Sequence, residues 1–165
     1  HGQHGLATAN HFFIMCDLLL FDYLSCAGHP FLQTPNIDRL AARGVRLTPG
    51  LLQSPVCGSS RMSYHTGRCM RSHGSNWNNF PLRVGEPTLG DHLKPLGVRT
   101  ALVGKTHMKS DDEGMTRLGI DSCSVIGVQA AQCGFEPYER DDSLHPHMLC
   151  RQAAGLRHVS ARPGL

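Results

Sequence analysis

Several side chains able to do chemistry stand where apolar segments of this sequence end or where a helix begins. A carboxylate can hold a hard cation, and a thiol at a helix N-terminus is a nucleophile beside free backbone N–H groups. Lysine and histidine can bind an anionic substrate. These types together predict a site with a cation, a nucleophile and an anion. The side chains are Asp17 after the run 11–16, Cys57 before a segment of helical character, and Lys105 and His107 after the run 98–103.

The elements that must position these side chains belong to an α/β fold, because open α/β sheets bind ligands at the carboxyl ends of their strands. Residues 11–16 and 98–103 are short apolar runs typical of buried strands. Alternation of such strands with helices predicts a mostly parallel sheet flanked by helices. The expected helices are 34–44 with Thr34 as N-cap and Gly44 as a left-handed C-cap, 59–66 closed by Gly67, and 88–94.

The rest of the chain carries weaker signals. Residues 71–87 are rich in Gly, Asn, Ser and Pro and predict a long loop, and residues 111–140 predict turns around the apolar patch 125–128. Two anion-binding loops are excluded. A tyrosine phosphatase loop would require arginine where Ser63 stands, and a nucleotide-binding P-loop would require glycine where Arg99 stands.

The order of the motifs resembles the sulfatase family of the alkaline phosphatase superfamily, close to the phosphonate monoester hydrolases and arylsulfatases. Residues 57–61 (CGSSR) with 66–68 (TGR) are similar to the signature C-x-P-S-R-x-x-x-x-T-G-R, and residues 104–107 (GKTH) to a second G-K-x-H element. The other similar segments are 14–17 at the metal-binding end of the first strand, 34–40, and 70–74 with 77–82, which resemble phosphonate monoester hydrolases in particular.

This resemblance implies an enzyme that hydrolyses small-molecule sulfate monoesters or phosphonate and phosphate esters. A formylglycine-generating enzyme would oxidise the signature cysteine to formylglycine, whose hydrated aldehyde attacks sulfur or phosphorus with help from a divalent Ca, Mg or Mn ion. The implied roles are Cys57 as formylglycine precursor and metal ligand, Asp17 as metal ligand, Arg61 as the group that orients formylglycine, Lys105 and His107 as contacts of substrate oxygens or nucleophile, and Asn78 and Thr106 as further anion contacts.

The chain also departs from the family pattern. Ser59 stands in place of the signature proline, and Leu18 in place of a polar residue after Asp17. No segment after residue 108 resembles the remaining metal-binding motif. We therefore expect an incomplete, alkaline-phosphatase-like fold: a flexible arm over 1–10, a partial catalytic domain over 11–145 and a disordered tail over 146–165.

Two alternatives to a working sulfatase stay open. One is a truncated, catalytically inactive remnant that at most binds anions or a partner chain. Because the remaining metal-binding motif is missing, we predict that the chain as given is inactive or nearly so. The other is a hydrolase that uses the unmodified thiol of Cys57.

Composition narrows the partners and the compartment. The net charge is +3 with Lys and Arg scattered along the 165 residues, which argues against nucleic acid. The longest apolar stretch, 12–20, is shorter than the roughly 20 residues of a membrane span. The absence of a signal sequence before residue 11 favours the cytoplasm, and the odd count of 7 cysteines favours reduced thiols. An oligomer is compatible with all of this.

Overall fold

The computed structural model describes residues 10–48, 50–105 and 107–139. The chain divides into two compact units, His1–Gly50 and Leu51–Leu165, and each is described by itself. The predicted arm, apart from residue 10, and the predicted tail lie outside the described residues. The domain boundaries drawn from the sequence stay predictions.

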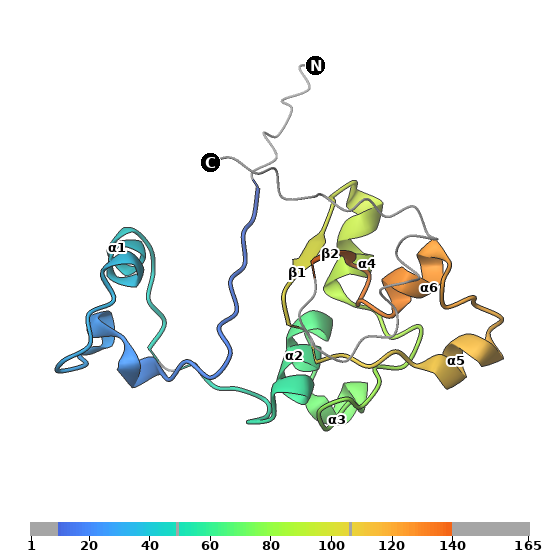
Figure 1. The fold of residues 1–165 in the computed structure, drawn as a ribbon, viewed down its shortest axis with the longest axis horizontal. Coiled ribbons are helices and arrows are strands. Elements are labelled where there is room, and N and C mark those ends of the chain that lie inside the picture. The colour runs from blue at the N-terminus through green and yellow to red at the C-terminus, as the bar shows by residue number, and fades with distance from the viewer. Residues whose placement is uncertain (1–9, 49, 106, 140–165) are drawn as a thin grey trace, which may run out of the picture. The chain divides into compact units, whose positions relative to one another are not determined.

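The first unit contains helix α1, Pro35–Arg43, close to the bounds that the sequence predicts (Figure 1). A short 3-10 turn, Ser25–Ala27, is tied to this helix by the carboxylate of Asp38. Asp38 accepts hydrogen bonds from the Ser25 hydroxyl at 2.6 Å and from the Cys26 N–H at 2.9 Å. The Ser25 bond is the main reason that the pKa of the Asp38 carboxyl lies below its usual value. Asp38 thus has a structural role within the motif 34–40.

Residues 11–16 form no strand, so that prediction is wrong. Their backbone is irregular, and the side chains of Phe12 and Ile14 are 89% and 66% exposed. A strand needs a hydrogen-bonded partner, and none of the described residues 10–48 forms one. The apolar run carries the signal for burial in a sheet, but it cannot specify which strand it pairs with.

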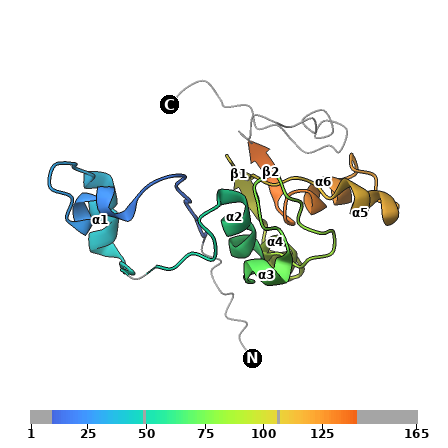
Figure 2. The ribbon, with the colours of Figure 1, turned by 90° about the horizontal axis from the view of Figure 1, so that it is seen from below.

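The second unit holds the remaining helices and both strands of the described chain (Figures 1 and 2). Helix α2 packs against α3 and α4, whereas α5 and α6 lie away from α2 in both views. The elements are α2 (Cys57–Thr66), α3 (Met70–His73), α4 (Leu89–Leu93), a 3-10 turn (Lys94–Leu96), β1 (Ala101–Val103), α5 (Asp112–Arg117), α6 (Val125–Ala130) and β2 (Glu136–Glu139).

Strands β1 and β2 form a parallel pair, and α5 and α6 lie in the crossover between them. Ala101 is in register with Glu136 and Leu102 with Pro137, and the register shifts after that pair. A parallel pair joined through helices is the βαβ arrangement of α/β proteins. The α/β class predicted from the sequence is therefore confirmed.

The core of the second unit lies among α2, the segment after β1 and the turn before β2. It consists of Met62, Met108, Cys133 and Phe135, with Leu82 and Leu102 packed against it. Helix α4 docks on the same turn, because the Thr88 hydroxyl donates to the Cys133 carbonyl at 2.5 Å. This core holds α2 close to the end of β1.

Several local predictions need correction. The strand predicted over 98–103 is confined to Ala101–Val103 and is largely exposed. Gly44 has an extended backbone (φ −125°) in place of the predicted left-handed cap, whereas Gly67 does close α2 with φ 65°. Helix α3 covers the first residues of the predicted loop 71–87, and the predicted turns over 111–140 contain α5, α6 and β2. Short capped helices of this kind are hidden from periodicity, because they span fewer than two turns.

Among the cysteines that the structure describes, the expected free thiols are found with one exception. Free thiols are carried by Cys16, Cys26, Cys57, Cys69 and Cys133. Cys123 is disulfide-bonded, which the sequence could not indicate because pairings between distant cysteines leave no local pattern. Within the described ranges, no helix is long and apolar enough to cross a bilayer.

Candidate active site

Helix α2 places Cys57 in its first turn, as the sequence predicts. The residue before it, Val56, is extended (φ −86°, ψ 127°), and its carbonyl accepts the Ser60 N–H at 2.9 Å. Cys57 is half-buried. The thiol therefore lies at the end of the helix where backbone N–H groups and the positive end of the helix dipole favour an anion.

Asn78 is brought to this helix end by a direct hydrogen bond. Its side-chain Oδ1 accepts the Gly58 N–H at 2.8 Å, across 20 positions of sequence. A Cβ on Gly58 would lie 2.9 Å from both the Asn78 Cα and the Trp77 carbonyl oxygen, so only glycine permits this approach. With its oxygen bonded to the first turn of α2, the Asn78 amide keeps its nitrogen as a donor.

Arg61 connects the same helix to the segment after β1. Its Nη1 donates to the Lys105 carbonyl at 2.7 Å, and its side chain is only 7% exposed. A buried guanidinium needs such acceptors, since an uncompensated buried charge is costly. Arg61 therefore fixes where the chain after β1 lies relative to Cys57.

Lys105 and His107 are half-buried in a bend that follows β1. Gly104 and His107 both have a positive φ, 85° and 53°. A positive φ is uncommon for histidine, and strained backbone of this kind concentrates at functional sites. Thr106, predicted as an anion contact, lies outside the described residues.

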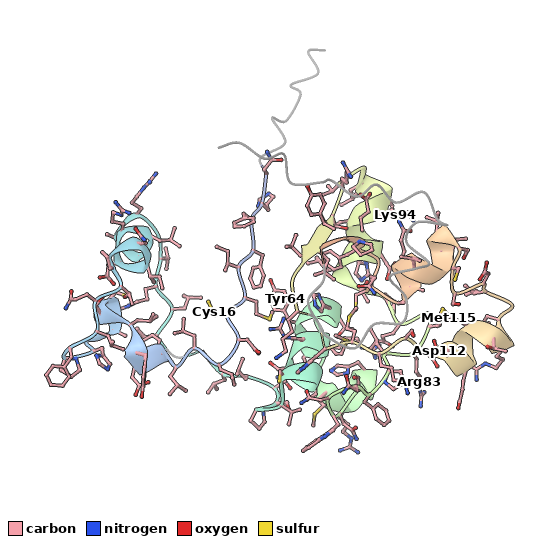
Figure 3. All side chains as sticks on the ribbon, viewed as in Figure 1. Cys16, Tyr64, Arg83, Lys94, Asp112 and Met115 are labelled. Atoms are coloured by element: carbon pink, nitrogen blue, oxygen red, sulfur yellow. The ribbon has the colours of Figure 1, made fainter. Side chains whose placement is uncertain are left out.

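Asp17 belongs to the other unit. It is exposed and follows an irregular segment from which Cys16 projects (Figure 3). Because the units are described separately, the predicted pairing of Asp17 with Cys57 at a metal stays a prediction. Among the described residues, no three His, Cys, Asp or Glu side chains gather into a group that could hold a metal ion.

A serine–histidine pair that sequence reasoning missed joins α2 to α3. Ser63 Oγ and His73 Nε2 are 2.9 Å apart, and His73 Nδ1 accepts the Ser75 N–H at 3.1 Å. Because Nδ1 is an acceptor, Nε2 carries the proton and donates to Ser63, so His73 is no base for that hydroxyl. Burial lowers the pKa of His73, in keeping with this neutral form. The pair joins α2 to α3 and is structural.

His65 is a buried histidine of α2. It is 7% exposed, its ring meets the Phe135 ring edge to face at 5.4 Å, and its Nδ1 makes no hydrogen bond with any described group. Burial, followed by the charge of Arg61, lowers the pKa of His65 to about 4. His65 is therefore neutral at physiological pH, and the positive charge beside it on α2 is that of Arg61.

A cavity of about 250 Å³ lies elsewhere in the unit, between the loop 82–88 and the ends of α4 and α6. None of the site residues predicted from the sequence lines it. Its lining residues are Leu82, Arg83, Val84, Gly85, Glu86, Pro87, Thr88, Asp91, Ala130 and Cys133.

Comparison with known proteins gives one consistent answer. A family model described as "Sulfatase" matches residues 9–142. Human steryl-sulfatase is 37% identical over 117 residues, which is 64% of this chain and 20% of that protein. N-acetylglucosamine-6-O-sulfatase of Bacteroides thetaiotaomicron is 31% identical over 137 residues, which is 82% of this chain and 24% of that protein.

A solved structure shows the same similarity. The crystal structure of phosphonate monoester hydrolase of Agrobacterium radiobacter superposes with a TM-score of 0.58 at 26% identity, over 72% of this chain and 23% of that one. The chain thus spans about a fifth to a quarter of the length of these relatives. The resemblance predicted from the motifs is confirmed.

Proposed function

The chain belongs to the sulfatase family, and from this premise we propose that it serves the hydrolysis of sulfate monoesters or of phosphonate and phosphate esters, with Cys57 as the precursor of a formylglycine nucleophile. Its homologues and its structural neighbour are sulfuric or phosphonate ester hydrolases by name. The names agree on a tetrahedral anion and differ in the alcohol that carries it, a sterol or an amino sugar. Our proposal extends to the ester group and leaves the alcohol open.

One observation carries the proposal: two segments distant in sequence are bonded to the first turns of α2, where Cys57 lies. Asn78 bonds to the residue after Cys57, and Arg61 bonds to the backbone of Lys105. Each segment brings a group that binds anions, and none of these bonds is needed to build the helix itself. This arrangement suits a nucleophile beside an anion site.

Formylglycine, once formed, would supply a hydroxyl of its hydrated aldehyde as the nucleophile. The chain's own residues then bind and orient the substrate. The Asn78 amide nitrogen and the Lys105 ammonium are our proposed donors to the non-bridging oxygens, and His107 is a further contact of substrate or nucleophile. Arg61 acts through position, because its buried charge holds the Lys105 segment and raises the local positive potential.

A divalent ion would supply neutralising charge for the substrate in such a site. The carboxylate of Asp17 has the right chemistry for one ligand, and we propose it in that role together with Cys57. Ca²⁺ and Mg²⁺, however, take about six or more ligands, mainly oxygens, and the described residues hold no group of three metal-binding side chains. The described residues by themselves do not make up a complete metal site.

The proposal is tested by turnover of an aryl sulfate and an aryl phosphonate monoester. The protein is co-expressed with a formylglycine-generating enzyme so that the signature is accessible before the chain folds, because Ser59 within it is fully buried in the folded chain. The proposal requires release of the aryl alcohol from at least one substrate and its loss in the variants Cys57→Ala and Asn78→Ala, whereas an inactive remnant releases none. Ser72→Ala, at an exposed position of α3, is the control and should leave turnover unchanged. Turnover that survives Cys57→Ala would contradict the proposal.

A further inference from the structure

Ser59 is the third residue of α2 and stands where the signature motif has proline. It is fully buried, at 0% exposure. Its hydroxyl donates to Ser54 Oγ at 2.7 Å and lies 3.2 Å from the Val56 carbonyl oxygen. The single Ser59 hydroxyl proton has two acceptors within reach, so this buried serine is accommodated by specific partners.

Ser54 completes the arrangement from the other side. It is 5% exposed, and its Oγ accepts the Val56 N–H at 3.1 Å. The two hydroxyls, the Ser54–Ser59 pair, therefore contact both the N–H and the carbonyl of Val56. Val56 is the residue directly before Cys57, so the pair fixes the backbone on which the thiol is mounted.

A proline at position 59 would restrict the same backbone by another route. Its ring fixes φ near −65°, and the third residue of a helix needs no N–H, because the first four N–H groups have no acceptor within the helix. We infer that the Ser54–Ser59 pair takes the place of the signature proline and that both serines are positioning residues for Cys57. This inference rests on the proposed function only in the role that it gives to Cys57.

The pair makes a prediction about the unmodified thiol that needs no catalysis. Without one hydroxyl, the first turn of α2 opens more often and the half-buried Cys57 thiol becomes more accessible. We expect Ser59→Ala and Ser54→Ala each to raise the alkylation rate of Cys57 by about fivefold, which corresponds to about 1 kcal/mol in the local opening equilibrium. Iodoacetamide labelling, followed by mass spectrometry of the Cys57 peptide, measures this rate in the full chain.

Two further variants separate positioning from general stability. Ser59→Pro should return the alkylation rate of Cys57 to the wild-type value, because the ring replaces the hydroxyl pair. Ser63→Ala removes another buried hydroxyl of the same helix, bonded to His73 and remote from the first turn, and should leave the rate unchanged. Labelling of the buried Cys133 in the same samples reports any general loosening of the unit.

The outcomes are separate from those of the proposed function. An increase in Ser59→Ala that Ser59→Pro reverses and Ser63→Ala does not reproduce supports the inference, even if no ester is hydrolysed. Unchanged labelling of Cys57 in both alanine variants, an equal increase in Ser63→Ala, or no reversal by Ser59→Pro would overturn it, even in an active enzyme.

Discussion

Helices α1 and α2 both have a proline at or just before their first residue, yet different forces hold them. Helix α1 has no buried residue, and the bonds that hold it run to a neighbouring turn through Asp38. Helix α2 buries seven residues and is tied by Asn78, Lys105 and His73 to three segments that lie farther along the chain. Local chemistry is enough for α1, whereas α2 depends on the fold around it. Helix α2, which carries the candidate nucleophile Cys57, is therefore held in place by contacts with the rest of its unit.

The largest effect should come from removing the charge that links α2 to the segment after β1. Arg61→Ala leaves the Lys105 carbonyl without its buried donor, and a hydrogen bond to a charged group is worth about 1.5–3 kcal/mol. We expect a loss of unfolding free energy of about that size in urea titration, together with loss of any esterase activity. Arg39→Ala on α1 is the matched control, because that side chain is exposed and should change stability little. Equal losses of unfolding free energy in Arg61→Ala and Arg39→Ala would contradict the difference that we draw between α2 and α1.

Acid should weaken the second unit through His65. A histidine whose folded-state pKa is lowered from 6.5 to about 4 binds fewer protons folded than unfolded. Its stability contribution is therefore full above pH 6.5 and is lost as the pH falls toward 4, by up to about 3 kcal/mol. Urea titrations at several pH values measure this slope, and His65→Leu should flatten it. A slope that is the same in His65→Leu would sink this account of the acid sensitivity.

The close approach of Asn78 to α2 predicts a smaller effect. In Gly58→Ala the new Cβ meets backbone at 2.9 Å, which costs about 1–3 kcal/mol when a packed segment must shift. In Gly44→Ala, after α1, the Cβ has one ordinary contact at 3.4 Å and φ is −125°, so we expect little change. Thermal unfolding compares the two variants. The interpretation fails if Gly58→Ala is as stable as the wild type.

The smallest effect is expected in the first unit. Asp38→Asn removes a negative charge that accepts bonds from the Ser25 hydroxyl and the Cys26 N–H. Faster hydrogen exchange should be confined to amides between residues 25 and 38, with α2 unaffected. Faster exchange in α2 would show that the two helices are not held independently.

Prediction from sequence succeeded where the residues of one segment determine its local structure by themselves. Pro35 at a helix start and Gly67 at a helix end are examples, and the Cys57 motif falls at the start of a helix as expected. It failed where an element needs a distant partner, as for residues 11–16, whose apolar character cannot name the strand beside them. Nor could it find the Asn78–Gly58 or Arg61–Lys105 bonds, because contacts 20 and 44 positions apart leave no local pattern. The G-S-S run did hold a signal for the Ser54–Ser59 pair, since a polar residue in a proline position calls for a partner.

Mass spectrometry of the tryptic peptide that contains Cys57, after co-expression with a formylglycine-generating enzyme, tests the central claim most directly. Conversion exchanges one sulfur and two hydrogens for one oxygen, so we predict a loss of about 18 Da from this peptide. Ser59→Pro, which restores the signature, is the positive comparison. An unmodified thiol at Cys57 in both proteins would contradict the formylglycine mechanism and would favour a remnant that binds anions without turning them over.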